Sequence, residues 1–181
     1  MVAFGSQGLF TEMVLPDQIE AYEAVVQPNA TTGYKLVTTG YGREVSNQTT
    51  DILSVRINAD GTRDTGYGTS GLVRIDVAGF ADNSRKLLVL GDRRVLLIGG
   101  GRATSSNVDG LVSILTPDGQ PDTSFSSTGY KLYDLGGPSD FLWSGALSPD
   151  KKTVALVGIK GVTASAMAND DAVLMLLSVA P

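Results

Sequence analysis

The stretch Val95-Leu96-Leu97-Ile98-Gly99 decides the fold, because it recurs on both sides of itself at one distance. Its copies are Leu36-Val37-Thr38-Thr39-Gly40 and Val154-Ala155-Leu156-Val157-Gly158, and the closing glycines are 59 residues apart. Self-similarity at a fixed period is the signature of a repeat architecture. The chain is therefore predicted to contain three copies of a unit of roughly sixty residues.

Two further markers occur in the same order in each copy. One is an aromatic residue followed by small residues and a glycine, and the other is an aspartate that leads into an apolar strand. The aromatic residues are Phe4, Tyr67 and Phe125, and the aspartates are Asp51, Asp109 and Asp171. We predict a single domain over residues 1–181, with repeats at about 4–66, 67–124 and 125–181. A position repeated in every copy is normally set by packing, so the aromatic residues are interpreted as structural wedges between repeats.

Short apolar runs alternate with Gly, Pro, Asn and Asp throughout, which is typical of strands and turns. In the middle copy the runs cover 72–77, 86–90, 94–99 and 110–115. The links between the second and third runs are short, which suits antiparallel hairpins. Residues 18–26 have some helical periodicity, but their second half aligns with strand segments of the other copies. The sequence predicts an all-β fold, a β-propeller with three four-stranded antiparallel blades per chain.

The composition is that of a folded acidic protein. The 181 residues are 42% hydrophobic and 18% charged, with a formal net charge of −5. This charge argues against a nucleic-acid partner, which needs a clustered positive surface. No apolar stretch approaches the roughly 18 to 20 residues that cross a bilayer, so we expect no membrane span. The chain contains neither Cys nor His, which removes the usual general base and the usual metal ligands. We expect no cofactor and no enzymatic activity.

Paired acids and exposed aromatic residues are the candidate binding groups. Asp60 with Asp64, and Asp118 with Asp122, recur at the same place and offer oxygen ligands to Ca²⁺. The preferred interpretation is turn chemistry, because two carboxylates in a turn are too few ligands for Ca²⁺. Trp143, Tyr41 and Tyr130 are candidates for stacking on a sugar, although aromatic residues more often fill cores. Four acids of the first copy offer a carboxylate pair for hydrolysis, and these are Glu12, Glu20, Glu23 and Glu44.

Two stretches resemble the delta-60 repeat of bacterial surface and secreted proteins. Residues 55–68 read VRINADGTRDTGYG, and residues 114–125 read ILTPDGQPDTSF. The family pattern is an Arg-Leu-Asn strand, an Asp-Gly turn, an Asp three or four residues later, and then Phe-Gly before a strand that ends in glycine. Phe125 departs from this pattern, because Ser126 follows it. The resemblance implies a β-propeller-like fold, an extracellular or cell-envelope location, and no common activity.

Three blades would leave two faces unpaired, since closed propellers typically have about four to eight blades. The predicted partner is a second copy, joined head to tail into a six-bladed ring, or else the remaining blades of a longer chain. We expect a scaffold or binding module for protein partners, with binding loops at 41–50, 100–108 and 159–170. The alternative is a carbohydrate-binding, lectin-like propeller. A carboxylate-dependent hydrolase or lyase is the less favoured third hypothesis.

Overall fold

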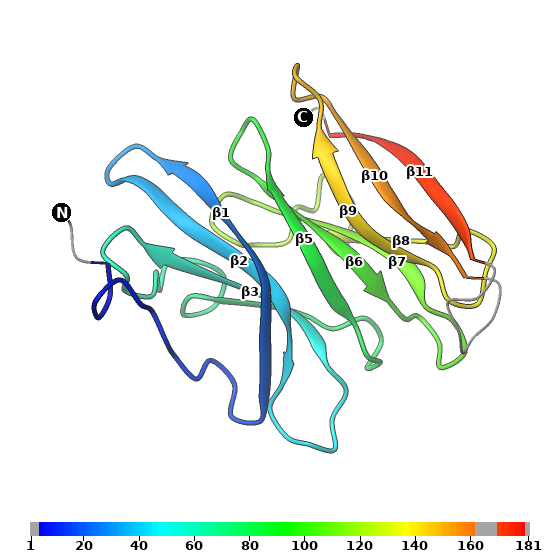
Figure 1. The fold of residues 1–181 in the computed structure, drawn as a ribbon, viewed down its shortest axis with the longest axis horizontal. Coiled ribbons are helices and arrows are strands. Elements are labelled where there is room, and N and C mark those ends of the chain that lie inside the picture. Colours follow the sequence, from blue (N-terminus) through cyan, green and yellow to red (C-terminus); the bar gives the residue numbers. More distant parts are fainter. Residues whose placement is uncertain (1–3, 162–169, 180–181) are drawn as a thin grey trace.

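The computed structural model describes residues 4–161 and 170–179, and in these residues all regular structure is β-strand (Figure 1). Eleven strands form three antiparallel sheets in which spatial order follows chain order. Sheet 1 contains β1 (Gln18–Asn29), β2 (Gly33–Arg43), β3 (Asp51–Asn58) and β4 (Leu72–Ile75). Sheet 2 contains β5 (Asn83–Val89), β6 (Val95–Gly101), β7 (Asp109–Leu115) and β8 (Tyr130–Tyr133). Sheet 3 contains β9 (Phe141–Leu147), β10 (Thr153–Lys160) and β11 (Asp171–Ser178). The predicted all-β antiparallel architecture is confirmed.

The sheets are out of phase with the sequence repeats. β4 follows the marker Tyr67, yet it pairs with β3 of the preceding copy, with Ile75 opposite Ile52 and Leu72 opposite Val55. β8 follows Phe125 and pairs with β7 in the same way. Each of these two sheets therefore takes its fourth strand from the next repeat.

The prediction of four strands in every sheet is wrong for the third copy. Within the described part of the chain, sheet 3 has three strands, and β11 pairs with β10 alone. The physical reason is the phase shift, since a fourth strand follows the next aromatic marker and no such marker follows Asp171 in this sequence.

A β-bulge recurs in the first strand of each sheet, opposite the repeated glycine. Gly40, Gly99 and Gly158 pair with Ala21, Ser84 and Leu142, and the next residue of the first strand is skipped in the pairing. The skipped residues are Tyr22, Arg85 and Trp143. A Cβ at Gly99 would lie 2.0 Å from the Asn83 carbonyl oxygen, and at Gly40 and Gly158 the corresponding distances are 1.8 Å and 2.1 Å. The glycine recurs because only it allows the bulged strand to come this close.

Apolar side chains form a core on each side of sheet 2. Successive side chains of a strand point to opposite faces, so Val95 and Leu97 of β6 pack toward sheet 1, while Leu96 and Ile98 pack toward sheet 3. All four are fully buried. The first strands of the sheets, β1, β5 and β9, lie next to one another along the near face in Figure 1.

Candidate functional site

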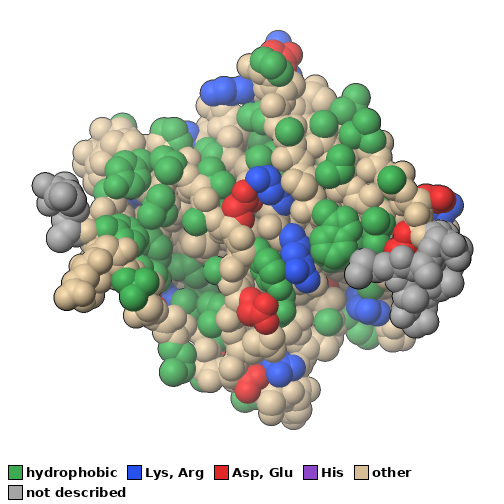
Figure 2. Space-filling model, viewed as in Figure 1, with side chains coloured by type: hydrophobic (Ala, Val, Ile, Leu, Met, Phe, Trp, Pro, Cys, Tyr) green, Lys and Arg blue, Asp and Glu red, His purple; other side chains and the backbone are tan. Residues whose placement is uncertain are grey.

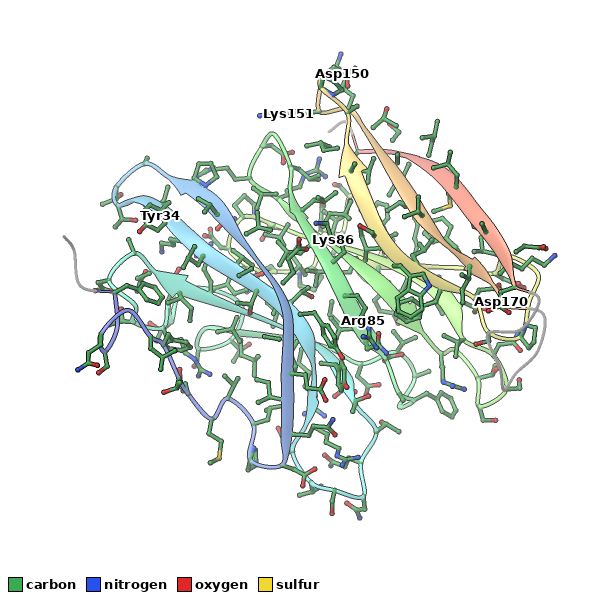
Figure 3. The ribbon with its side chains drawn as sticks, viewed as in Figure 1. Tyr34, Arg85, Lys86, Asp150, Lys151 and Asp170 are labelled. Atoms are coloured by element: carbon green, nitrogen blue, oxygen red, sulfur yellow. The ribbon has the colours of Figure 1, made fainter. Side chains whose placement is uncertain are left out.

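The three bulged residues meet on one face of the molecule. The guanidinium carbon of Arg85 lies 4.2 Å from the ring centroid of Tyr22 and 5.5 Å from that of Trp143. Tyr22 and Trp143 remain 40% and 38% exposed, so the cation is held between two rings that solvent still reaches. A β-bulge re-aims its side chain and is common next to functional sites. We call Tyr22, Arg85 and Trp143 the bulge cluster, and Figure 3 shows Arg85 projecting from β5 within it.

Further aromatic residues extend the bulge cluster on both sides. The Tyr22 and Tyr41 rings stack with centroids 5.7 Å apart, and the Phe141 and Trp143 centroids are 4.4 Å apart. Hydrogen bonds from Tyr41 and Tyr22 lower the pKa of Glu20, and the contact with Tyr22 raises the pKa of Tyr41. Tyr41 is therefore a neutral hydrogen-bond donor beside an ionised Glu20 at neutral pH.

A hollow of about 310 Å³ lies beside the bulge cluster, between β5 and β9. Its polar and aromatic lining consists of Asn83, Arg85, Arg102, Ser139, Phe141 and Trp143. Arg85 Nε and Asn83 Oδ1 are buried and have no hydrogen-bond partner among the described residues. Among the described residues no acid lines the hollow, although the chain carries a net charge of −5. Figure 2 shows Lys and Arg side chains beside hydrophobic ones at the centre of this face.

The repeated acids of the Asp-Gly turns are held by cations or by the turn itself. Lys35 and Arg56 each contact Asp64 Oδ2 at 2.5 Å, and Arg94 contacts Asp122 at 2.8 Å. Burial opposes the change, but Lys35 and Arg56 lower the pKa of Asp64 below the ordinary value. Hydrogen bonds from Ser124 and Arg94 do the same to the pKa of Asp122.

Asp60 and Asp118 lie at the tips of the turns. Asp60 accepts a hydrogen bond of 2.9 Å from the Thr62 backbone, while Asp118 is 78% exposed and lies 3.3 Å from Arg56. None of the four turn acids belongs to a group of three carboxylates that converge on one point in the described residues. Their contacts fit the interpretation as turn chemistry.

Two other sets of three carboxylates occupy equivalent places, one where the first repeat meets the second and one where the second meets the third. The sets are Asp51, Asp76 and Asp82, and Asp109, Asp134 and Asp140, with one oxygen of each residue within 4.8 Å of the others. Asp51 pairs with Arg74. Asp82 accepts backbone hydrogen bonds from Val77 at 2.7 Å and Arg102 at 2.9 Å, and Asp140 accepts one from Leu135 at 2.7 Å. These acids brace the loops that enter β5 and β9, and the sequence pattern singled out only Asp51 and Asp109.

Two of the repeated aromatic residues, Tyr67 and Phe125, lie at the contacts between sheets. Tyr67 is fully buried, and its hydroxyl lies 2.9 Å from Ser54 Oγ. Phe125 packs against the core between sheets 2 and 3, and Tyr130 packs against the core between sheets 1 and 2. Phe4 opens a turn in which Gly5 donates a backbone hydrogen bond to Asp60, as Gly68 does to Asp118. Asp171 is exposed at the start of β11.

The four glutamates of the first copy do not come together. Each has a partner of its own: Glu12 contacts Arg63, Glu23 contacts Lys86, Glu44 contacts Arg74, and Glu20 accepts hydrogen bonds from Tyr22 and Gln18. The three loops singled out in the sequence join the second and third strands of each sheet, and most of 159–170 lies outside the described residues.

The outer face of sheet 3 is apolar and exposed. The fourth and sixth residues of β11, Leu174 and Leu176, are 72% and 69% exposed. The same positions of β7, Val112 and Ile114, are 0% and 1% exposed, because sheet 3 covers them. Sheet 3 therefore presents to solvent the face that sheet 2 buries.

The outer face of sheet 1 contains an apolar hollow of about 420 Å³. Val55 and Ile57 line it together with Phe10, Val14 and Ile19. Val55 and Ile57 are the fifth and seventh residues of β3, and the seventh residue of β7, Leu115, packs toward sheet 1. The hollow thus lies on the side of sheet 1 that corresponds to the side of sheet 2 that packs against sheet 1.

Comparison with protein-family models and with curated proteins found no match for this sequence. No helix of the described residues is long and apolar enough to span a membrane. The delta-60 resemblance and the expected location stay predictions from the sequence.

Proposed function

We propose that this chain is a non-catalytic β-propeller module of the bacterial exterior or cell envelope. Two copies join head to tail in a six-bladed ring, which acts as a scaffold or binding module for partner molecules. The observation that carries the proposal is the exposure of Leu174 and Leu176, at positions that are buried in the preceding sheet.

The two contacts between sheets within the chain supply the pattern for the proposed contact between two copies. In both of them, the even-numbered positions of a third strand face the next sheet, and the odd-numbered positions face the preceding one. By this pattern, Leu174 and Leu176 fit the hollow on the outer face of sheet 1 of another copy. The contact joins two different faces, and a heterologous contact that closes on itself leaves no free apolar face.

The segment before β1 supports the same arrangement. The turn at 4–9 repeats the turn at 67–72: Gly8 donates to Phe4 and Gly71 to Tyr67, both at 2.8 Å, and bridges join Ser6 to Leu9 and Thr69 to Leu72. After the second turn, β4 pairs with β3, whereas residues 10–12 pair with no described strand.

The packing of residues 9–14 is also equivalent to that of β4. Phe10 and Val14 line the hollow on sheet 1, as Val73 and Val77 pack in the core against sheet 2. These residues thus lie against sheet 1 as the outermost strand of a preceding sheet would. We apply the register of β3 with β4 to β11 of one copy and residues 9–12 of the other. It sets Leu9 opposite Met175 and Thr11 opposite Val173.

Light scattering after gel filtration tests the assembly. We expect twice the chain mass of 18.9 kDa for the wild-type protein and the mass of one chain for Leu174→Lys. Val45→Lys is the matched control, because Val45 is 47% exposed in the loop between β2 and β3, away from both outer faces. A monomeric wild type at micromolar concentration would contradict the second copy and favour further repeats of a longer chain as the occupant.

Disulfide trapping tests the register independently. The natural chain has no cysteine, so Thr11→Cys combined with Val173→Cys introduces the only thiols. Directly opposite residues of antiparallel strands have Cα atoms about 4.5 to 5.5 Å apart, within the range of a disulfide. Oxidation should give a covalent dimer, whereas Thr11→Cys with Ser178→Cys, about 16 Å farther along β11, should not. Equal trapping of both pairs would refute the register.

A further inference from the structure

We propose that the hollow beside the bulge cluster binds an acidic sugar, a pyranose ring that carries a carboxylate. This names a ligand for the binding module proposed above and rests on that role, but it does not depend on the second copy. Three properties of the hollow support it: a guanidinium that forms no ion pair with the described residues, a partly exposed indole, and a buried acceptor that has no donor among those residues.

The cation favours a carboxylate. Arg85 forms no ion pair with any described residue, although five other arginines do: Arg43, Arg56, Arg63, Arg74 and Arg94. Arg102 lines the same hollow, and no acid from the described part of the chain does. A guanidinium binds a carboxylate through two parallel hydrogen bonds. The hollow is therefore a cationic site on a chain of net charge −5.

The aromatic residues favour a ring over a bare anion. Tyr22 and Trp143 hold the Arg85 side chain between them, so little of its freedom is left to lose on binding. The indole of Trp143 lies against Phe141 and is 38% exposed, which leaves an apolar surface at the edge of the cationic site. A pyranose has an apolar C–H face that packs on such a ring while its polar groups point sideways.

The buried acceptor favours a hydroxylated ligand. Asn83 lines the hollow, and its Oδ1 is buried and accepts no hydrogen bond from a described residue; Ser139 also lines the hollow, from the loop before β9. A sulfate ion would satisfy Arg85 but has no hydroxyl for Asn83, whereas a sugar acid supplies both. The volume of about 310 Å³ lies at the low end of the range for ligand pockets, about 300 to 1,000 Å³, and suits one sugar residue.

Trp143 provides the assay, because it is the only tryptophan in the chain and lines the hollow. The intrinsic fluorescence of the wild-type protein is titrated with trigalacturonate, with neutral maltotriose and with sodium sulfate. We expect a saturable change with trigalacturonate alone, weakened at least tenfold at high salt because the contact is ionic. No saturable change, or an equal response to maltotriose or sulfate, would overturn the proposal.

Two variants make the test specific. Arg85→Gln should weaken trigalacturonate binding at least tenfold, and Asn83→Ala should weaken it less. Arg93→Gln is the control, because it removes the same charge from an exposed turn at the far end of β5. Unchanged binding by Arg85→Gln, with an unchanged melting temperature, would refute the assignment. The mass of each sample is measured in parallel. A dimer that does not bind trigalacturonate is thereby distinguished from a chain that binds it but does not form a dimer.

Discussion

Asp82 should make the protein less stable as the pH rises from about 4 to about 7. Burial raises the pKa of its carboxyl to about 7, from an ordinary value of 3.8. The folded protein therefore holds a proton that the unfolded chain releases. The contribution of Asp82 to the free energy of unfolding is complete below the pKa of the unfolded chain. It is lost as the pH rises through the pKa of the folded protein. A shift of about 3 units corresponds to about 4 kcal/mol at about 1.36 kcal/mol per unit.

The surroundings of Asp82 explain the direction of this shift. The residue is 1% exposed, and the carboxylates of Asp51 and Asp76 oppose a further negative charge. Backbone hydrogen bonds from Val77 and Arg102 act in the other direction, but burial outweighs them. Asp82→Asn keeps the shape and removes the titration. The amide loses one of the two acceptor oxygens, so the variant starts with a constant penalty of about 1 to 3 kcal/mol.

Urea unfolding at several pH values between 4 and 8 measures the effect. The quantity compared is the difference in unfolding free energy between wild type and Asp82→Asn, because the other carboxyls cancel in it. We expect this difference to fall by about 4 kcal/mol across the range, to the disadvantage of the wild type. A difference that stays constant within about 1 kcal/mol would refute the reasoning.

Two substitutions test the repeated positions. Gly99→Ala should lower the free energy of unfolding by more than about 3 kcal/mol, because its Cβ would lie 2.0 Å from the Asn83 carbonyl oxygen. Gly33→Ala, with nothing within 4 Å and a φ of +79°, should lower it by about 1 to 2 kcal/mol. Equal losses in urea unfolding would contradict the bulge argument. Asp122→Ala should cost about 1 to 3 kcal/mol because it removes a partner of buried Arg94, while Asp118→Ala, at a site 78% exposed, should cost less than about 1 kcal/mol; the reverse order would show that the tip of the turn matters more than the ion pair.

The strands and their antiparallel order could be predicted because their signals are local. Apolar runs such as Val95–Gly99 and the short links between them depend only on neighbouring residues. The sheet boundaries could not be predicted in the same way. β4 is adjacent in sequence to the marker Tyr67 and belongs by period to the middle copy, but it pairs with β3. Pairing across a loop of this length is a tertiary choice that the repeat period does not reveal.

The candidate site was predicted only in part, for a similar reason. Trp143 and Tyr41 were singled out as aromatic residues, but Arg85 and Asn83 carry no motif of their own. Their role arises from the bulge, and a bulge is a property of the register between two strands. The repeated glycine was a usable signal, because the residue opposite it in each first strand precedes Tyr22, Arg85 or Trp143.

The proposed assembly needs both the burial of apolar side chains and the pairing of strand edges to be stable. Full burial of a leucine contributes about 1.5 to 3 kcal/mol, and a closed ring of two chains has two identical contacts, so Leu174 and Leu176 of both copies together supply about 6 to 12 kcal/mol. Association of two chains costs an estimated 4 to 15 kcal/mol or more in lost freedom, and the leucines alone do not offset the upper part of that range. The remainder has to come from the rest of the apolar hollow on sheet 1 and from the backbone hydrogen bonds of the β11 edge. Both contributions come from the same segment, because a sheet takes its fourth strand from the next repeat. The strand that pairs with the sheet edge also packs its apolar side chains in the hollow or core beside that edge.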